Sequence, residues 1–122
     1  MPGNIIKTLG AAQTLDFAAV SSGVTAGVMQ EYGTLNNEVC GFPLVTAASG
    51  VSHSVVVGGV EVEYDSPTGD TPAIGALVYY DDVEDEVTTT AGGHFYCGRA
   101  SKLKGSETRV RFILNSPQVT NT

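Results

Sequence analysis

The feature that most constrains this chain is a two-residue alternation of apolar and polar side chains, interrupted at short intervals by glycine. It is clearest where Val60, Val62 and Tyr64 alternate with Glu61 and Glu63. Side chains of a β-strand point alternately to its two faces, so this pattern is typical of a strand with one face in a core and one in water. Fifteen glycines and five prolines among 122 residues favour tight turns between strands over helices.

The same reasoning predicts a series of short strands. The β-branched run from Ser54 to Val57 ends at Gly58-Gly59, a pair suited to a two-residue turn, so we expect a hairpin there. Further strands are expected at 28–32, 40–46, 76–80, 86–90, 95–100 and 108–114, and a mixture of loop and strand at 18–27. About seven or eight short strands predict an all-β fold, a compact small barrel or jelly-roll-like sandwich, because an open sheet of this size would expose a long apolar face.

The chain length and the distribution of polar residues predict one domain with two short flanking parts. Residues 1–12 are expected to be an N-terminal arm or first strand, residues 13–114 the β-barrel or sandwich domain, and residues 115–122 a polar C-terminal tail.

The charge balance bears on possible partners. Thirteen acidic and six basic residues give a net charge of −7, which repels phosphate backbones and anionic lipid headgroups, so we expect neither nucleic acid nor a membrane as a partner. No stretch approaches the roughly 18 to 20 apolar residues that span a bilayer, and the N-terminus lacks a secretory pattern. A soluble compartment is therefore expected.

The chain has few residues of the types that commonly bind metals or act in catalysis, and their spacing fits neither role. Neither His53 nor His94 has a second His or Cys at a metal-binding spacing. Cys40 and Cys97 lie far apart in the sequence and are expected to be reduced thiols that pack as small hydrophobes. Nucleophile-elbow and phosphate-loop motifs do not occur. We expect no catalytic residue, no metal, no cofactor and no enzymatic activity.

Charged residues gather in two segments. Five carboxylates fall within the six residues from Asp81 to Glu86, without the spacing of a helix-loop-helix calcium site. We expect a solvated hairpin tip there. The segment Lys102-Leu103-Lys104-Gly105 is expected to be a basic turn whose lysines face the solvent.

Several short segments occur in a characteristic order along four fifths of the chain. They are 20–23, 48–50, 59–62, 74–82, 87–93, 98–100 and 108–112, and the most specific is the run Val-Tyr-Tyr-Asp-Asp at 78–82 followed by Val-Thr-Thr-Thr at 87–90. In these segments the chain resembles the capsid cement, or head-decoration, proteins of tailed double-stranded-DNA bacteriophages. The departures are Cys40, Cys97 and the long connection 33–37.

The resemblance implies a structural virion protein, assembled in the bacterial host cytoplasm. Such a protein binds the outer surface of the phage head, bridges neighbouring subunits of the major capsid protein, and stabilises the shell against the pressure of packaged DNA. It also implies a homodimer or homotrimer, because several weak contacts become avid on a symmetric lattice.

Two other functions remain open at this stage. The first is a carbohydrate- or receptor-binding β module of a phage tail or surface appendage, with Tyr79, Tyr80, Phe95 and Tyr96 as an aromatic platform. The second is a small hydrolase that uses Asp65, Asp70 or the acidic segment as paired carboxylates.

The candidate capsid-binding residues are Ile5, Ile6, Lys7 and Leu9, which put three apolar side chains and one cation close to the N-terminus. Two interpretations are open. The segment is either the first strand of the barrel, or an arm that is loose in the free protein and is ordered on contact, by adding as an edge strand or by docking its apolar side chains.

Overall fold

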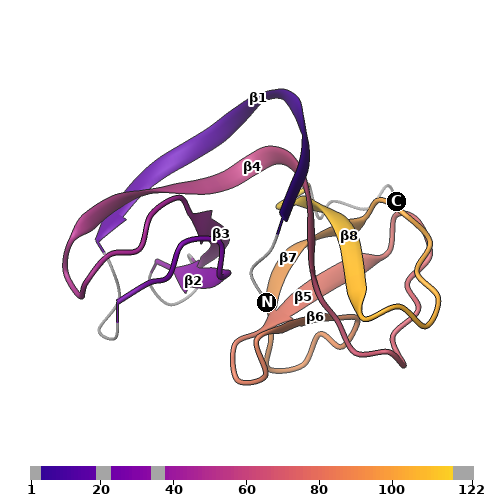
Figure 1. Ribbon diagram of the computed structural model, residues 1–122. Coiled ribbons are helices and arrows are strands. Elements are labelled where there is room, and N and C mark those ends of the chain that lie inside the picture. The colour runs from indigo at the N-terminus through magenta and orange to yellow at the C-terminus, as the bar shows by residue number, and fades with distance from the viewer. Residues whose placement is uncertain (1–3, 19–22, 34–37, 117–122) are drawn as a thin grey trace.

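The computed structural model of the protein describes residues 4–18, 23–33 and 38–116, and in these ranges it contains β-strands and loops but no helix (Figure 1). The strands are β1 (Asn4–Ala18), β2 (Gln30–Tyr32), β3 (Val39–Pro43), β4 (Ser52–Asp65), β5 (Leu77–Asp81), β6 (Glu86–Thr88), β7 (Phe95–Ala100) and β8 (Arg109–Leu114). The prediction of an all-β fold is confirmed.

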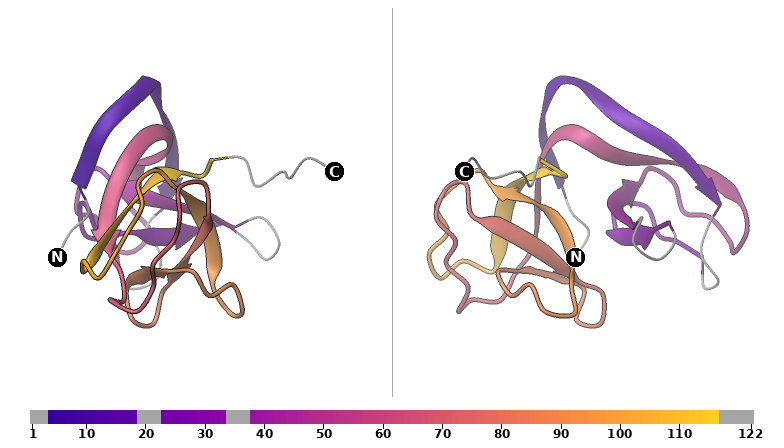
Figure 2. Two further views of the ribbon diagram at one scale, coloured as in Figure 1. Left: turned by 90° about the vertical axis from the view of Figure 1, so that its right-hand side faces the viewer. Right: turned by 180° about the vertical axis from the view of Figure 1, so that it is seen from behind.

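All strand pairs are antiparallel, in the order β2-β3-β4-β8-β7-β5-β6, and β1 pairs with β4 outside this path. Figures 1 and 2 show two groups of strands, β2–β3 and β5–β8, joined by an arched ribbon of β1 and β4. The sheet curls into a half-barrel, because the long strand β4 contributes one half of its length to each group.

The prediction of a hairpin at Gly58-Gly59 is wrong, because β4 runs without interruption through both glycines. The chain does not reverse there because β1 pairs with both halves of β4, with a register shift between Thr8 and Gln13 opposite the glycines. Gly59 takes a φ of +72°, a conformation that side chains other than glycine rarely adopt. The pair therefore bends one long strand, as a bulge does, and does not form a turn.

One main core joins the two groups of strands. Met29 and Phe42 from the β2–β3 group pack in the same buried cluster as Tyr64, Tyr80 and Phe112. The rings of Phe42 and Tyr64 lie 5.6 Å apart between centroids. A smaller cluster formed by Val24, Tyr32 and Val55 lies apart from the main core. The two groups are thus held together by packed side chains as well as by the ribbon.

The predicted alternation holds in the second half of β4, with one exception. Val60, Val62 and Tyr64 are fully buried. Glu61 was expected on the solvent side, but it is also buried, and its Oε2 accepts a hydrogen bond of 2.5 Å from the hydroxyl of Ser101. A buried carboxylate needs such a partner to offset its loss of hydration.

Both cysteines are free and fully buried in the main core. Burial raises the pKa of the Cys40 thiol to about 12, with smaller contributions from Glu31 and Asp82, and it raises the pKa of the Cys97 thiol well above its usual range. At neutral pH both remain protonated, apolar packing groups.

The first residue of the expected C-terminal tail is anchored to the sheet. Asn115 has a φ of +51°, and its side-chain amide donates to the backbone oxygens of Cys40 and Val57, each at 2.7 Å. Asn115 therefore helps to hold the end of β8 against β3 and β4. Residues 117–122 of the expected tail lie outside the described residues.

Candidate functional site

The N-terminal candidates lie at the end of β1 that pairs with the second half of β4. Ile5 is opposite Val62 and is 47% exposed, and Ile6 is partly buried. Lys7 and Leu9 belong to the same strand, but their side chains are outside the described part of the structure. Among the described strands β1 pairs only with β4, so its other edge offers backbone groups that a further strand can bond.

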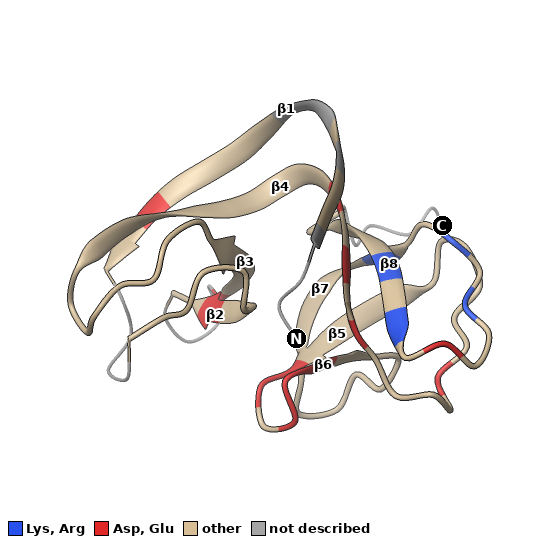
Figure 3. Ribbon diagram, viewed as in Figure 1, with Lys and Arg blue, Asp and Glu red and all other residues tan. Residues whose placement is uncertain are grey.

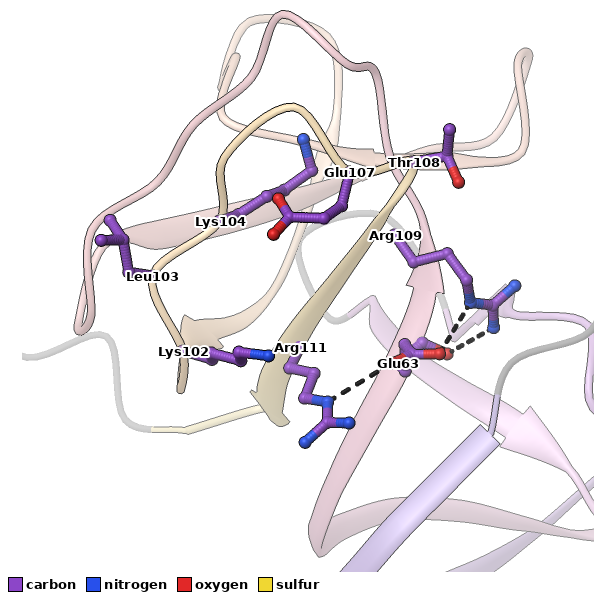
Figure 4. A pocket seen from close by; sticks show the side chains of 8 residues that line it. All are labelled: Glu63, Lys102, Leu103, Lys104, Glu107, Thr108, Arg109 and Arg111. Atoms are coloured by element: carbon purple, nitrogen blue, oxygen red, sulfur yellow. Dashed lines mark hydrogen bonds and ion pairs between the residues drawn. The ribbon is translucent and has the colours of Figure 1, made fainter.

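A second surface feature is a hollow of about 230 Å³ beside β8 (Figure 4). We call it the basic groove, and its lining residues are Glu63, Lys102, Leu103, Lys104, Glu107, Thr108, Arg109 and Arg111. Four of the six basic residues of the chain line it, against two carboxylates. By formal charge the lining is thus net positive, on a protein whose overall charge is −7.

The arginines of the groove lie on the outer face of β8, because successive side chains of this strand alternate between its two faces. Val110 and Phe112 point into the core, which leaves Arg109 and Arg111 on the other face. Arg109 Nε lies 3.0 Å from Glu63 Oε1, and Arg111 Nε lies 3.3 Å from Glu63 Oε2. Arg109 Nη1 also pairs with Asp65 Oδ1 at 2.9 Å. These cross-strand pairs fix the arginines against β4, so the wall of the groove is well ordered.

Lys104 corrects the expectation that this loop is a solvated basic turn. Lys104 is only 4% exposed. Its Nζ donates to the backbone oxygens of Pro67, Asp70 and Gly105 at 2.9, 2.5 and 3.3 Å, which matches the three donors of an ammonium group. This role could not be predicted from local sequence, because two of the acceptors lie 34 and 37 positions away.

The acidic segment forms the expected hairpin tip between β5 and β6. Asp81 Oδ1 accepts hydrogen bonds from the backbone nitrogens of Val83 and Glu84 at 3.0 and 3.1 Å, which orders the turn. Asp82, Val83 and Glu84 are exposed. Among the described residues no group of His, Cys, Asp or Glu is arranged to hold a metal ion.

Asp85 departs from the expectation of a fully solvated tip. It has a φ of +55°, and its Oδ1 lies 2.5 Å from the hydroxyl of Tyr64 and 2.8 Å from that of Tyr80. The Tyr64 hydroxyl in turn accepts a hydrogen bond from the backbone nitrogen of Met29. Asp85 therefore anchors the acidic hairpin to the core and, through Tyr64, to the β2–β3 group.

We expect Asp85→Ala to lower the free energy of unfolding by about 2 kcal/mol, because it leaves two buried tyrosine hydroxyls without their carboxylate partner. Alanine also tolerates the positive φ less well than Asp or Asn. Urea denaturation of the variant measures the change. Asp82→Ala, on the same turn but exposed, is the matched control and should change stability by under about 0.5 kcal/mol. Equal effects of the two substitutions would contradict the anchoring role.

The aromatic residues do not form an exposed platform. Tyr80 is 4% exposed, and its hydroxyl lies 3.0 Å from the backbone oxygen of Met29. Tyr79 and Tyr96 pack edge to face with centroids 6.1 Å apart, and Phe95 packs against the main core. This arrangement does not support the carbohydrate-binding alternative.

The carboxylates considered for hydrolysis each have a local structural partner. Asp70 Oδ2 accepts hydrogen bonds from the Thr88 hydroxyl at 2.7 Å and from the Thr89 nitrogen at 3.0 Å. Asp65 pairs with Arg109. These contacts connect loops and strands.

The two histidines also make local contacts. His53 is buried and hydrogen-bonds the Tyr32 hydroxyl at 2.8 Å. His94 contacts the backbone oxygen of Thr90 at 2.8 Å and lies 3.4 Å from Asp81.

Comparison with known proteins identifies a family. A family model described as phage cement protein matches residues 10–114, which is most of the chain but begins after Ile5, Ile6, Lys7 and Leu9. Neither the curated proteins nor the solved structures gave a match. The described part of the chain contains no helix able to cross a membrane.

Proposed function

Because the chain belongs to the phage cement protein family, we propose that it binds the outer surface of the assembled phage head and bridges neighbouring subunits of the major capsid protein. The family is a structural one, and it gives the protein a structural role in the phage capsid. The observation that best supports this proposal is the match of the family model to residues 10–114. The bridging contact would stabilise the shell against the pressure of packaged DNA.

The way in which the fold is cross-linked supports a bridging role, because a bridge must hold its two contacts at a fixed separation. Figures 1 and 2 show the two groups of strands at opposite ends of the β1–β4 ribbon. Packing of Phe42 against Tyr64 and the hydrogen bonds of Asn115 to Cys40 and Val57 join these groups. Pre-organisation of this kind lowers the entropy lost on binding.

We place the capsid contact at the N-terminal end of β1, with Ile5, Ile6, Lys7 and Leu9 as the contact residues. Ile5 is about half exposed although it is apolar, and the outer edge of β1 is unpaired among the described strands. A capsid segment could add to this edge through backbone hydrogen bonds while Ile5 docks in an apolar pocket. Residues 4–18 are already paired with β4, so the edge is formed before contact.

We expect binding to depend on the state of the shell, because a bridging protein recognises the relative placement of neighbouring subunits. Co-sedimentation should show saturable binding to expanded heads and weaker binding to unexpanded shells. The isolated capsid monomer should bind about 100-fold more weakly than expanded heads, the scale of an avidity effect from two linked contacts. Equal affinity for all three forms would contradict bridging.

A further inference from the structure

Two of the three most exposed large apolar side chains in the described part of the chain lie at oppositely charged surfaces. Val83 is 85% exposed, Ile74 71% and Leu103 62%. Val83 is at the acidic hairpin tip, between Asp82 and Glu84. Leu103 lines the basic groove. Single exposed apolar residues are common, but Val83 lies among carboxylates and Leu103 lies between two lysines, so the surroundings of these two residues have opposite charge.

The acidic tip, residues 81–86, is a fixed projection. The carboxylate of Asp81 caps the backbone of Val83 and Glu84, and Asp85 is held by two buried tyrosines. The tip contains five carboxylates and no basic residue. Burial, followed by the charges of Glu84 and Asp81, raises the pKa of the Glu86 carboxyl.

The segment that contains Ile74 neighbours the loop of the basic groove. The backbone nitrogen of Lys104 donates to the oxygen of Pro72 at 3.2 Å, and that of Gly75 donates to the oxygen of Ala100 at 2.8 Å. The segment 72–75 therefore runs alongside 100–104, although Ile74 itself does not line the groove. Lys102, on the same loop, is exposed. The groove thus combines an apolar rim with positive charge.

We propose that the acidic tip of one copy of this protein docks in the basic groove of a second copy. Val83 would pack against Leu103 and Ile74, while Asp82 and Glu84 face Lys102 and the arginines. Figure 3 shows the acidic tip and the basic residues on different sides of the β5–β8 group, so one copy can offer both surfaces at once. Such a contact is heterologous, and it forms a closed ring if its rotation closes.

A second copy fits the groove better than a phosphate-bearing ligand does. Arg109 and Arg111 already pair with Glu63, and two carboxylates, Glu63 and Glu107, belong to the lining. The phosphates of a nucleic acid would meet these carboxylates as the acidic tip does, but phosphates offer no apolar group to the exposed Leu103. The acidic tip instead brings an apolar side chain for the rim, and every copy of the protein supplies it. This inference deepens the proposed function, because it assigns a surface to the expected homo-oligomer.

The test uses charge reversal of exposed residues in the full-length protein, measured by sedimentation velocity over a range of concentrations at low salt. Asp82→Lys alters the tip and Lys102→Glu alters the groove. Each should weaken self-association about tenfold or more, which corresponds to about 1.4 kcal/mol. Asp16→Lys has the same charge change as Asp82→Lys but lies on the distant half of β1, opposite Ser54, and should leave self-association unchanged.

A mixture of the two variants gives the sharper result. The Asp82→Lys copy keeps a native groove and the Lys102→Glu copy keeps a native tip, and the two altered surfaces are again opposite in charge, so the mixture should regain the association that each variant alone has lost. A monomeric wild type at low salt would overturn the proposal, as would variants that associate like the wild type. The assay contains no heads, so its outcome is independent of the proposed capsid binding.

Discussion

Gly98→Ala should lower the free energy of unfolding by about 3 kcal/mol or more, a large effect for the addition of one methyl group. A Cβ at this position would overlap the carbonyl oxygen of Ile113 and come within 2.9 Å of Phe112 Cδ2. Gly98 lies opposite Leu114 in the pairing of β7 with β8. The backbone of β8 can move away only by weakening this pairing and the packing of Phe112, which is fully buried.

Gly92→Ala is the matched control for this substitution. Gly92 lies in the turn before β7, and a Cβ there would meet no atom within 4 Å. Removing a glycine at an unstrained position restricts the unfolded chain, so stability should stay within about 1 kcal/mol of the wild type or rise slightly. Urea denaturation followed by circular dichroism measures both variants. Similar losses at the two positions would show that the close approach of β7 and β8 is not what makes Gly98 necessary.

The strands of the second half of the chain could be predicted closely because their signals are local. The predicted strand at 95–100 coincides with β7, the predicted strand at 76–80 is shifted by one residue from β5, and the predicted strand at 108–114 begins one residue before β8. In this region short turns connect alternating segments, so each strand can be recognised from its own residues. The acidic hairpin was recognised in the same way.

The β1–β4 ribbon could not be predicted because its cause is non-local. Gly58-Gly59 has the composition of a turn, and only the presence of β1 alongside both halves of β4 makes it a bend in one strand. The pairing joins residues about 35 to 60 positions apart, such as Ala18 with Ser52 and Asn4 with Glu63. No local pattern encodes a partner at that separation, since register depends on which face of each strand is buried.

The structural roles of two charged residues were missed for a related reason. Asp85 and Lys104 occur in segments rich in like charges, which favour solvent exposure. Their partners, such as Tyr64 and the backbone of Pro67, lie elsewhere in the chain. One available signal was the pair Tyr64 and Tyr80 in strands with buried faces, because a buried tyrosine hydroxyl usually needs a hydrogen-bond partner. The sequence does not say which carboxylate supplies it.

Deletion of residues 1–10 should weaken head binding by about 100-fold or more, the loss expected when one of two linked contacts is removed. The body of the protein should survive, because residues 61–65 of β4 remain paired with β8 after the deletion. Circular dichroism should still show β structure, with a lower melting temperature because the outer edge of β4 loses its partner. Co-sedimentation with expanded heads measures the binding.

Two point variants separate a lost contact from a lost strand. Ile5→Lys and Leu15→Lys place the same charge on β1 at residues that are 47% and 50% exposed, so their costs to folding should be small and similar. Only Ile5→Lys should reduce head binding, because Ile5 lies at the proposed capsid contact and Leu15 lies at the other end of the strand, opposite Val55. If both variants bind heads normally, β1 serves the fold alone. The loops of the β5–β8 group would then be the next surface to test, beginning with residues 101–107.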